Sequence, residues 1–158
     1  MRHAGRADDC QMIRKILVSS DGSALAELAV SKAIELAKAT GASVVAVMVT
    51  EPPPLRMYGY PIPPGTETQS HYDDEQQQLS LKILEPIKRA AQAAGVPCAG
   101  SSVSSRSPGD AIVAAAEHEG CDLICIAMHQ TRSLLGANPD RTTTRVLARA
   151  RVPVLLCH

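Results

Sequence analysis

The segment from Ala127 to Arg141 carries the most informative chemistry of this chain. It reads Ala-Met-His-Gln-Thr-Arg-Ser-Leu-Leu-Gly-Ala-Asn-Pro-Asp-Arg and has the length of a phosphate-binding loop. A loop that wraps phosphate with backbone N–H groups needs glycines, because glycine tolerates positive φ and lets the main chain approach the ligand. This segment has one glycine, Gly136, away from the places where such a loop needs one. The sequence therefore indicates a nucleotide-binding scaffold whose nucleotide site has been lost or reassigned.

Charged side chains in and around this segment offer two other kinds of chemistry. Arg132 and Arg141 flank it, so together they could hold an anion by side-chain charge in place of a backbone cradle. Arg141 could equally form an ordinary surface ion pair with Asp140, the commoner arrangement. His129 has no carboxylate or nucleophile paired with it in the sequence, so we expect a solvated loop histidine.

Short apolar runs alternate with helical patterns along the whole chain. The strands are expected at 14–20, 44–49, 96–103, 122–127 and 152–156, and the helices at 23–41, 68–94, 107–119 and 142–150. This alternation predicts an open, doubly wound parallel sheet with right-handed crossovers. Ligands of such sheets bind beyond the carboxyl ends of the strands, so Asp21 and the 127–141 segment should meet at that edge.

Individual residues refine this prediction. Apolar strand positions covered on both faces should be buried; they are Ile16, Val18, Val45, Val47, Ile124 and Ile126. Leu79, Ile83 and Ile87 should form the apolar stripe of the second helix, and Pro86 is expected to kink it. Ser107 should cap the third helix, with Pro108 in its first turn.

The stretch 51–65 interrupts the alternation. It holds six prolines in fifteen residues, so we expect an extended, non-helical excursion. Met57, Tyr58 and Tyr60 make it a candidate lid or partner-docking segment, although long irregular loops are also tolerated as simple insertions.

Composition narrows the class of protein. A chain of 158 residues with 45% hydrophobic positions suits one domain, predicted at 14–158 after a flexible tail at 1–13. Sixteen basic and sixteen acidic residues cancel, and three tyrosines offer little stacking surface, so nucleic-acid binding is disfavoured. No apolar run has signal-peptide or membrane-spanning length, which favours a cytoplasmic protein without membrane contact. The five cysteines, including Cys121 and Cys125, lack zinc-site spacing, so we expect reduced core thiols and no metal.

Four motifs in order resemble the universal stress protein family from about Arg14 to Leu156. They are Ile16 to Ser23, Ser107 to Ile112, Gly120 to Ile124, and Arg145 to Leu147 with Pro153 to Leu155. The resemblance implies a Rossmann-like fold, similar to adenine nucleotide alpha hydrolases, with a five-stranded parallel sheet in the order 3-2-1-4-5. It also implies two helices on each face and a stress-response protein that acts by binding, not as an enzyme. A phosphorylatable receiver domain has similar topology, but Val103-Ser104-Ser105 lacks its phosphoacceptor aspartate.

The same resemblance bears on nucleotide binding. Nucleotide-binding members carry a Gly-x2-Gly-x9-Gly-Ser/Thr pattern, whose slots here hold Ala127, Gln130, Asp140 and Arg141. The family pocket also maps to Ser19, Ser20, Asp21, Val49 and Arg132. Asp21 could contact adenine or ribose as in such members, but Asp in an Asp-Gly-Ser turn commonly just accepts backbone N–H bonds, and we favour that structural role.

The pair His129-Gln130 resembles a subgroup of the family without the glycine pattern. We therefore expect no cofactor and no standard ATP binding. The alternative is an ATP-binding, slowly hydrolysing member with an atypical phosphate loop.

The C-terminal strand is the expected assembly surface. The apolar run from Val152 to Cys157 should lie at a sheet edge, and an uncovered edge invites pairing with a second copy. The family resemblance likewise implies a homodimer through this strand. We expect Val154 and Leu156 near a two-fold axis, and an unidentified protein partner besides.

Overall fold

The computed structural model describes residues 13–53, 56–57, 59–61, 63–65, 67–133 and 136–158. The predicted flexible tail at 1–13 lies outside these residues except for Ile13. Ile13 is partly buried and packs against the hydrophobic core.

Five parallel strands form the central sheet. They are β1 (Lys15–Ser19), β2 (Ser43–Thr50), β5 (Cys98–Ser104), β6 (Leu123–Ala127) and β9 (Val154–Cys157). Their order is β5-β2-β1-β6-β9, which confirms the predicted order 3-2-1-4-5. Leu17 of the central strand pairs with Val45 on one side and Ile124 on the other.

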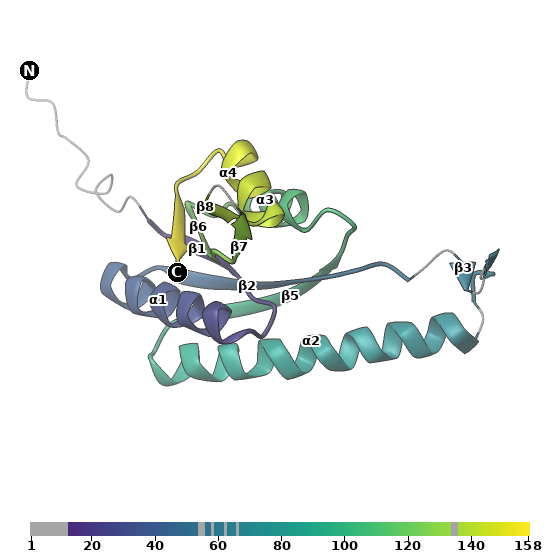
Figure 1. Cartoon of the computed structure of the whole chain (residues 1–158). Coiled ribbons are helices and arrows are strands. Elements are labelled where there is room, and N and C mark those ends of the chain that lie inside the picture. The colour runs from purple at the N-terminus through teal and green to yellow at the C-terminus, as the bar shows by residue number, and fades with distance from the viewer. Residues whose placement is uncertain (1–12, 54–55, 58, 62, 66, 134–135) are drawn as a thin grey trace, which may run out of the picture.

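Four helices cover both faces of the sheet, as expected. They are α1 (Ala24–Thr40), α2 (Glu67–Ala93), α3 (Pro108–Glu119) and α4 (Arg141–Arg149). Side chains of α1 and α2 pack on one face and side chains of α3 and α4 on the other, which gives two core clusters separated by the sheet (Figure 1). The six strand residues predicted to be buried are all buried.

Local signals explain where α1 begins and ends. The Ser23 side chain accepts a hydrogen bond from the backbone N–H of Ala26, which satisfies one donor of the first turn. Gly41 closes the helix in the left-handed region at φ 71°, and its N–H donates to the carbonyl of Ala37. The predicted helix from Ser23 to Gly41 is therefore confirmed.

The buried face of α2 matches the predicted stripe only in part. Ile87 is buried and Ile83 packs against the core, as predicted. Leu79 is 41% exposed, whereas Ser80, Leu84, Ile87 and Ala91 are buried. The buried positions are spaced by four, three and four residues, so the helix turns a face beside the predicted one toward the sheet. The helix runs through Pro86 without a break.

The start of α3 also departs from the expectation. Ser107 precedes the helix and Pro108 opens it, as predicted, but the Ser107 side chain does not cap any backbone N–H. Its hydroxyl instead donates to Oδ2 of Asp110 at 2.7 Å. A hydrogen bond from a hydroxyl to a carboxylate is charge-assisted, which stabilises this orientation of the Ser107 side chain.

Two short antiparallel pairs stand outside the main sheet. The first, β3 (Arg56–Met57) with β4 (Tyr60–Pro61), falls within the predicted extended stretch and lies near the N-terminal end of α2 (Figure 1). The second, β7 (Gln130–Ser133) with β8 (Gly136–Pro139), lies between β6 and α4. Within the described residues, no helix is both long enough and apolar enough to cross a membrane.

Candidate functional site

A small pocket lies at the carboxyl ends of β1 and β6, where the strand order reverses. Its volume is about 220 Å³. It is lined by Ser19, Ser20, Asp21, Ala26, Val49, Pro108, Ile112, Ile126, Ala127, His129, Asp140 and Thr142. The position matches the general location of ligand sites in doubly wound sheets. Pockets for drug-sized ligands usually measure about 300–1,000 Å³, so this one is small for an intact nucleoside triphosphate.

The turn after β1 is held by its own polar side chains. Oδ1 of Asp21 accepts the backbone N–H of Ser23 at 2.9 Å, and Oγ of Ser20 accepts that of Gly22 at 3.2 Å. Asp21 thus has the turn-closing role that its sequence context predicts. Its second carboxylate oxygen is left for another partner.

That partner is His129, contrary to the expectation of a solvated histidine without a carboxylate beside it. His129 Nε2 lies 3.5 Å from Oδ2 of Asp21, with side chains 44% and 63% exposed. Partial burial alone raises the pKa of Asp21, but hydrogen bonds from Ser23 and the nearby imidazole outweigh it, so this pKa lies below its ordinary value. Asp21 is therefore ionised at neutral pH and contributes negative charge to the pocket.

Two short strands within the 127–141 segment form a hairpin. β7 and β8 pair in antiparallel register from Gln130 with Pro139 to Ser133 with Gly136. Gln130 and Arg132 both lie in β7. The backbone N–H of Asp140 donates to the carbonyl of His129 at 3.0 Å, which closes the base of the hairpin. The hairpin thereby places Asp140 directly at the pocket.

Asp140 caps α4 with its side chain. Its Oδ1 accepts the backbone N–H of Thr143 at 2.9 Å, and its own carbonyl accepts from the N–H of Thr144. Free N–H groups at a helix N-terminus are a ready anion site. Here the chain's own carboxylate already takes one of these donors.

Arg141 does not form the ion pair with Asp140 that the sequence suggested as the commoner arrangement. The described residues include no ion pair of Arg141. Arg141 is exposed and faces a separate hollow on the outer side of α4. Asp140 and Arg141 are successive residues at the start of α4, so their side chains leave the helix in different directions. Asp140 therefore lines the pocket and Arg141 does not.

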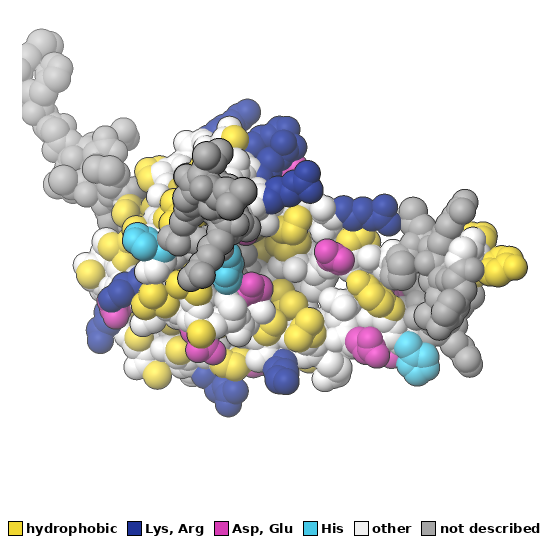
Figure 2. Space-filling view, in the orientation of Figure 1, with side chains coloured by type: hydrophobic (Ala, Val, Ile, Leu, Met, Phe, Trp, Pro, Cys, Tyr) yellow, Lys and Arg dark blue, Asp and Glu magenta, His cyan; other side chains and the backbone are white. Residues whose placement is uncertain are grey.

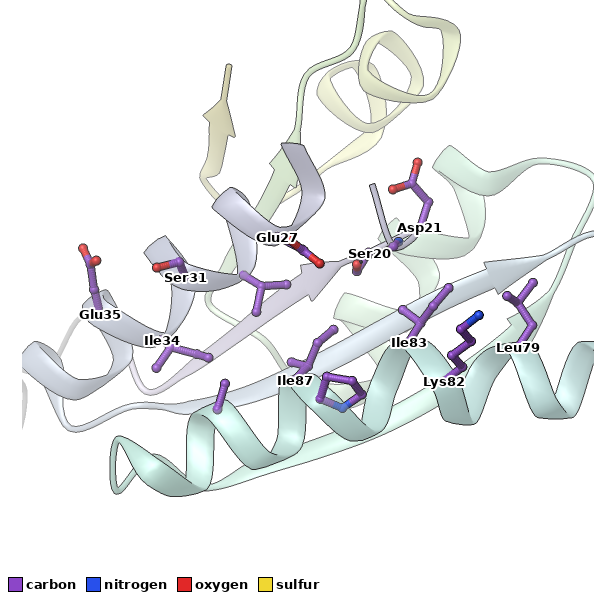
Figure 3. Close-up of a pocket in the computed structure, with 14 residues that line it drawn as sticks. Ser20, Asp21, Glu27, Ser31, Ile34, Glu35, Leu79, Lys82, Ile83 and Ile87 are labelled. Atoms are coloured by element: carbon purple, nitrogen blue, oxygen red, sulfur yellow. Dashed lines mark hydrogen bonds between the residues drawn. The ribbon is translucent and has the colours of Figure 1, made fainter. Parts of the chain in front are cut away.

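A larger apolar groove lies on the other side of the turn after β1. It measures about 720 Å³ and runs between α1 and α2, with Ile34 of α1 opposite Ile83 and Ile87 of α2 (Figure 3). Ser20 and Asp21 line both the groove and the pocket. Leu79, which periodicity alone attributed to the core, also lines this groove.

Most of the predicted pocket positions come together. Ser19, Ser20, Asp21, Val49, Ala127 and Asp140 line the pocket, whereas Arg141 does not. The side chains of Gln130 and Arg132 lie outside the described part of the structure. That these residues bind a ligand remains a prediction. The sequence did not indicate Pro108, Ile112 and Thr142 as pocket residues, although Pro108 stands in a recognised helix start. The described residues contain no group of three or more His, Cys, Asp or Glu side chains placed to hold a metal ion.

Fold and pocket together define a doubly wound α/β protein with a pocket at the switch point of the sheet. The sequence matches the universal stress protein family over residues 12–158. The chain therefore belongs to the universal stress protein family, as its motifs suggested. No curated protein matches the sequence.

Solved structures of the family share the fold. A universal stress family protein from Burkholderia pseudomallei is 27% identical, with a TM-score of 0.70 over 92% of this chain and 96% of that one. UspA from Lactobacillus plantarum is 21% identical, with a TM-score of 0.74 over 92% and 98%. The universal stress protein from Archaeoglobus fulgidus in complex with dAMP is 19% identical, with a TM-score of 0.62 over 93% and 99%.

Proposed function

We propose that this chain is a cytoplasmic stress-response protein that acts by binding, as a homodimer, and does not hold ATP in a glycine cradle. The observation that carries the proposal is the hydrogen bond from the Thr143 N–H to the Asp140 carboxylate. At this helix start a backbone cradle would offer N–H groups to phosphate. In this chain a fixed negative charge stands there instead.

Charge adds to the loss of donors. Asp21 and Asp140 both line the pocket, and like charges in a partly enclosed site repel a polyphosphate. The glycine slots at Ala127 and Gln130 also carry side chains where backbone would have to approach the ligand. The proposal thus places this chain with the subgroup that lacks the glycine pattern.

The competing function is ATP binding, with slow hydrolysis, through an atypical phosphate site. The Archaeoglobus fulgidus relative was solved with dAMP, so the shared fold accommodates a nucleotide at low sequence identity. An exposed arginine at Arg141 gives this alternative a source of positive charge near the pocket. Direct titration separates the two functions.

Isothermal calorimetry with ATP is the test of the proposal. The unmodified protein should show no binding at micromolar ATP. A variant with four substitutions restores the family pattern: Ala127→Gly, Gln130→Gly, Asp140→Gly and Arg141→Ser. It should bind ATP at least tenfold tighter, because backbone N–H donors are freed and the negative charge of Asp140 is removed. Glycine at a helix N-cap costs only about a few tenths of a kcal/mol relative to aspartate, so the variant should remain folded.

Asp140→Asn is the matched control, since asparagine caps a helix as well as aspartate but carries no charge. It should gain less ATP affinity than the variant with four substitutions, because the asparagine side chain still accepts the N–H of Thr143. Micromolar ATP binding by the unmodified protein would contradict the proposal and establish the competing function.

The homodimer is proposed through β9. This strand is the last of the five in the sheet, and its outer edge has no neighbouring strand among the described residues. Val154 and Leu156 are only half-buried there.

Four cysteines of the described part are free thiols, which agrees with the proposed location in a reducing compartment, the cytoplasm.

A further inference from the structure

Arginines concentrate on one surface, over α3 and α4. Arg141, Arg145 and Arg149 recur every four residues along α4, and Arg106 precedes α3. Figure 2 shows Lys and Arg side chains gathered over these two helices. Residues four apart lie on the same side of a helix, so the three α4 arginines share one face.

Some of these arginines are already paired. Asp110 Oδ1 lies 2.8 Å from Arg145 Nε and 3.5 Å from Arg149 Nε. Arg151 Nε lies 3.5 Å from Glu117. In the part of the chain that the structure describes, Arg106 and Arg141 have no carboxylate within ion-pair distance.

The two unpaired arginines line the same hollow. It measures about 650 Å³ and lies between the start of α3 and the first turns of α4. Its lining is Arg106, Ser107, Pro108, Gly109, Arg141, Thr142, Thr144, Arg145 and Ala148. Pro108 and Thr142 also line the pocket at the strand ends, so they stand between the two cavities.

The electrostatic balance of this hollow is positive. Arg145 and Arg149 neutralise Asp110, which lies beside the hollow and is the nearest acidic group of α3. The helix start at α3 has no side-chain cap, so the positive end of its dipole adds to the two free guanidinium groups. Among the described residues, no carboxylate lines the hollow itself.

We propose that this hollow binds the phosphoryl group of a small phosphorylated molecule through the side chains of Arg106 and Arg141. A guanidinium presents two parallel N–H donors that match two oxygens of a phosphoryl group, and two such forks can hold a dianion. Ser107 and Thr142 line the same space. The inference goes beyond the proposed function, because this hollow is a different cavity from the pocket at the strand ends, although Arg141 stands in the Ser/Thr slot of the family's glycine pattern.

Pyrophosphate is the probe, titrated by calorimetry at low ionic strength. The unmodified protein should bind it, and added salt should weaken binding because the interaction is electrostatic. Arg106→Gln and Arg141→Gln should each weaken binding about tenfold, as expected for the loss of a charge-assisted hydrogen bond. Arg151→Gln removes the same charge from an 86% exposed side chain outside the hollow and should leave the affinity unchanged.

Two results would overturn the inference. One is no binding of pyrophosphate by the unmodified protein at millimolar concentration. The other is that Arg106→Gln and Arg151→Gln weaken pyrophosphate binding equally. That result would mean that the surface attracts anions by its overall positive charge and has no specific site. Thermal unfolding of each variant verifies that it is folded.

ADP and adenosine identify the source of the phosphoryl group and keep this test distinct from the ATP test. If ADP binds with the affinity of pyrophosphate and adenosine does not bind, the site recognises the phosphoryl group and not the nucleobase. If ADP binds at least tenfold tighter and loses this affinity in Arg141→Gln, the arginine site stands and the proposal of no ATP binding fails. Absence of pyrophosphate binding leaves that proposal untouched.

Discussion

Two aspartates at helix starts act in opposite ways on nearby positive charge. Asp140 uses its carboxylate on the backbone of α4 and leaves Arg141 without an ion pair. Asp110 turns its carboxylate outward to Ser107, Arg145 and Arg149. Because Asp110 takes two arginines and Asp140 takes none, the free positive charge of this surface is left at Arg106 and Arg141.

Asp110 should make stability depend on pH in the acid range. The hydrogen bond from Arg145, with that from Ser107, lowers the pKa of Asp110 from 3.8 to about 2. A carboxyl whose pKa is lowered by folding stabilises the native state above its ordinary pKa, and this contribution is lost as the pH falls toward the folded value. Asp110→Asn should therefore lower the melting temperature most above about pH 5, and the difference should vanish as the pH approaches about 2.

Thermal unfolding followed by circular dichroism across this pH range measures the difference. Asp74→Asn, which removes an exposed aspartate without an ion pair among the described residues, is the control and should show a smaller effect. A difference between Asp110→Asn and the unmodified protein that stays constant with pH would show that ionisation is not its cause.

At the scale of elements, the contact of α3 with α4 depends on one glycine. A Cβ added to Gly109 would lie 2.6 Å from Cβ of Arg145 and 3.0 Å from the carbonyl oxygen of Thr142. Neither atom can move by a side-chain rotation, so only glycine lets the two helices approach this closely. The hollow between their starts depends on that approach.

Gly109→Ala should destabilise the protein although alanine is the better helix former. The propensity gain is about 0.5–1 kcal/mol, whereas overpacking of this kind costs about 1–3 kcal/mol. We expect a net loss of about 1–2 kcal/mol in the free energy of unfolding, measured in urea. Ala114→Gly, at an exposed position of the same helix, gives the propensity effect alone. A stabilised Gly109→Ala variant would show that the helices separate at no cost.

The sequence predicted the elements better than the contacts between them. Hydrophobic period and capping residues located the five strands of the main sheet and the four helices, because these are local signals. The ion pair of Asp21 with His129 joins two strand ends 108 residues apart and depends on β1–β6 register. The hollow at Arg106 and Arg141 likewise arises only from the packing of α3 on α4, which no local pattern encodes.

Other corrections have the same physical origin. Leu79 follows the helical period of α2, but the helix covers only part of the sheet and leaves this residue at the open groove. The 127–141 segment reads as a loop because the strand pairing of β7 and β8 lacks a clear alternating pattern. Tertiary contacts decide between such alternatives.

At the scale of the whole molecule, the free edge of β9 should set the oligomeric state. Leu155 is 37% exposed on this strand, and the edge offers unpaired backbone groups to a second copy. Val154→Lys should shift the protein toward monomer in sedimentation velocity, because it places a charge near the proposed two-fold axis. Leu81→Lys on α2 has an exposed side chain away from β9 and should leave the dimer intact.

Thermal unfolding shows whether Val154→Lys is folded, since Val154 is half-buried. An unmodified protein that sediments as a monomer at micromolar concentration would rule out the proposed assembly.

The central place of β1 also governs the order in which the chain can fold during synthesis. Its first neighbour, β2, follows within about thirty residues, but its second neighbour, β6, is reached only at Leu123. Until then one edge of β1 has no partner strand. In the finished sheet Ile16, Leu17 and Val18 of this strand are fully buried. Long-range parallel pairing is slow, and unpaired apolar edges are prone to aggregate. A nascent chain that ends before β6 therefore exposes one edge of this apolar strand, and chaperone binding should be strongest over that interval.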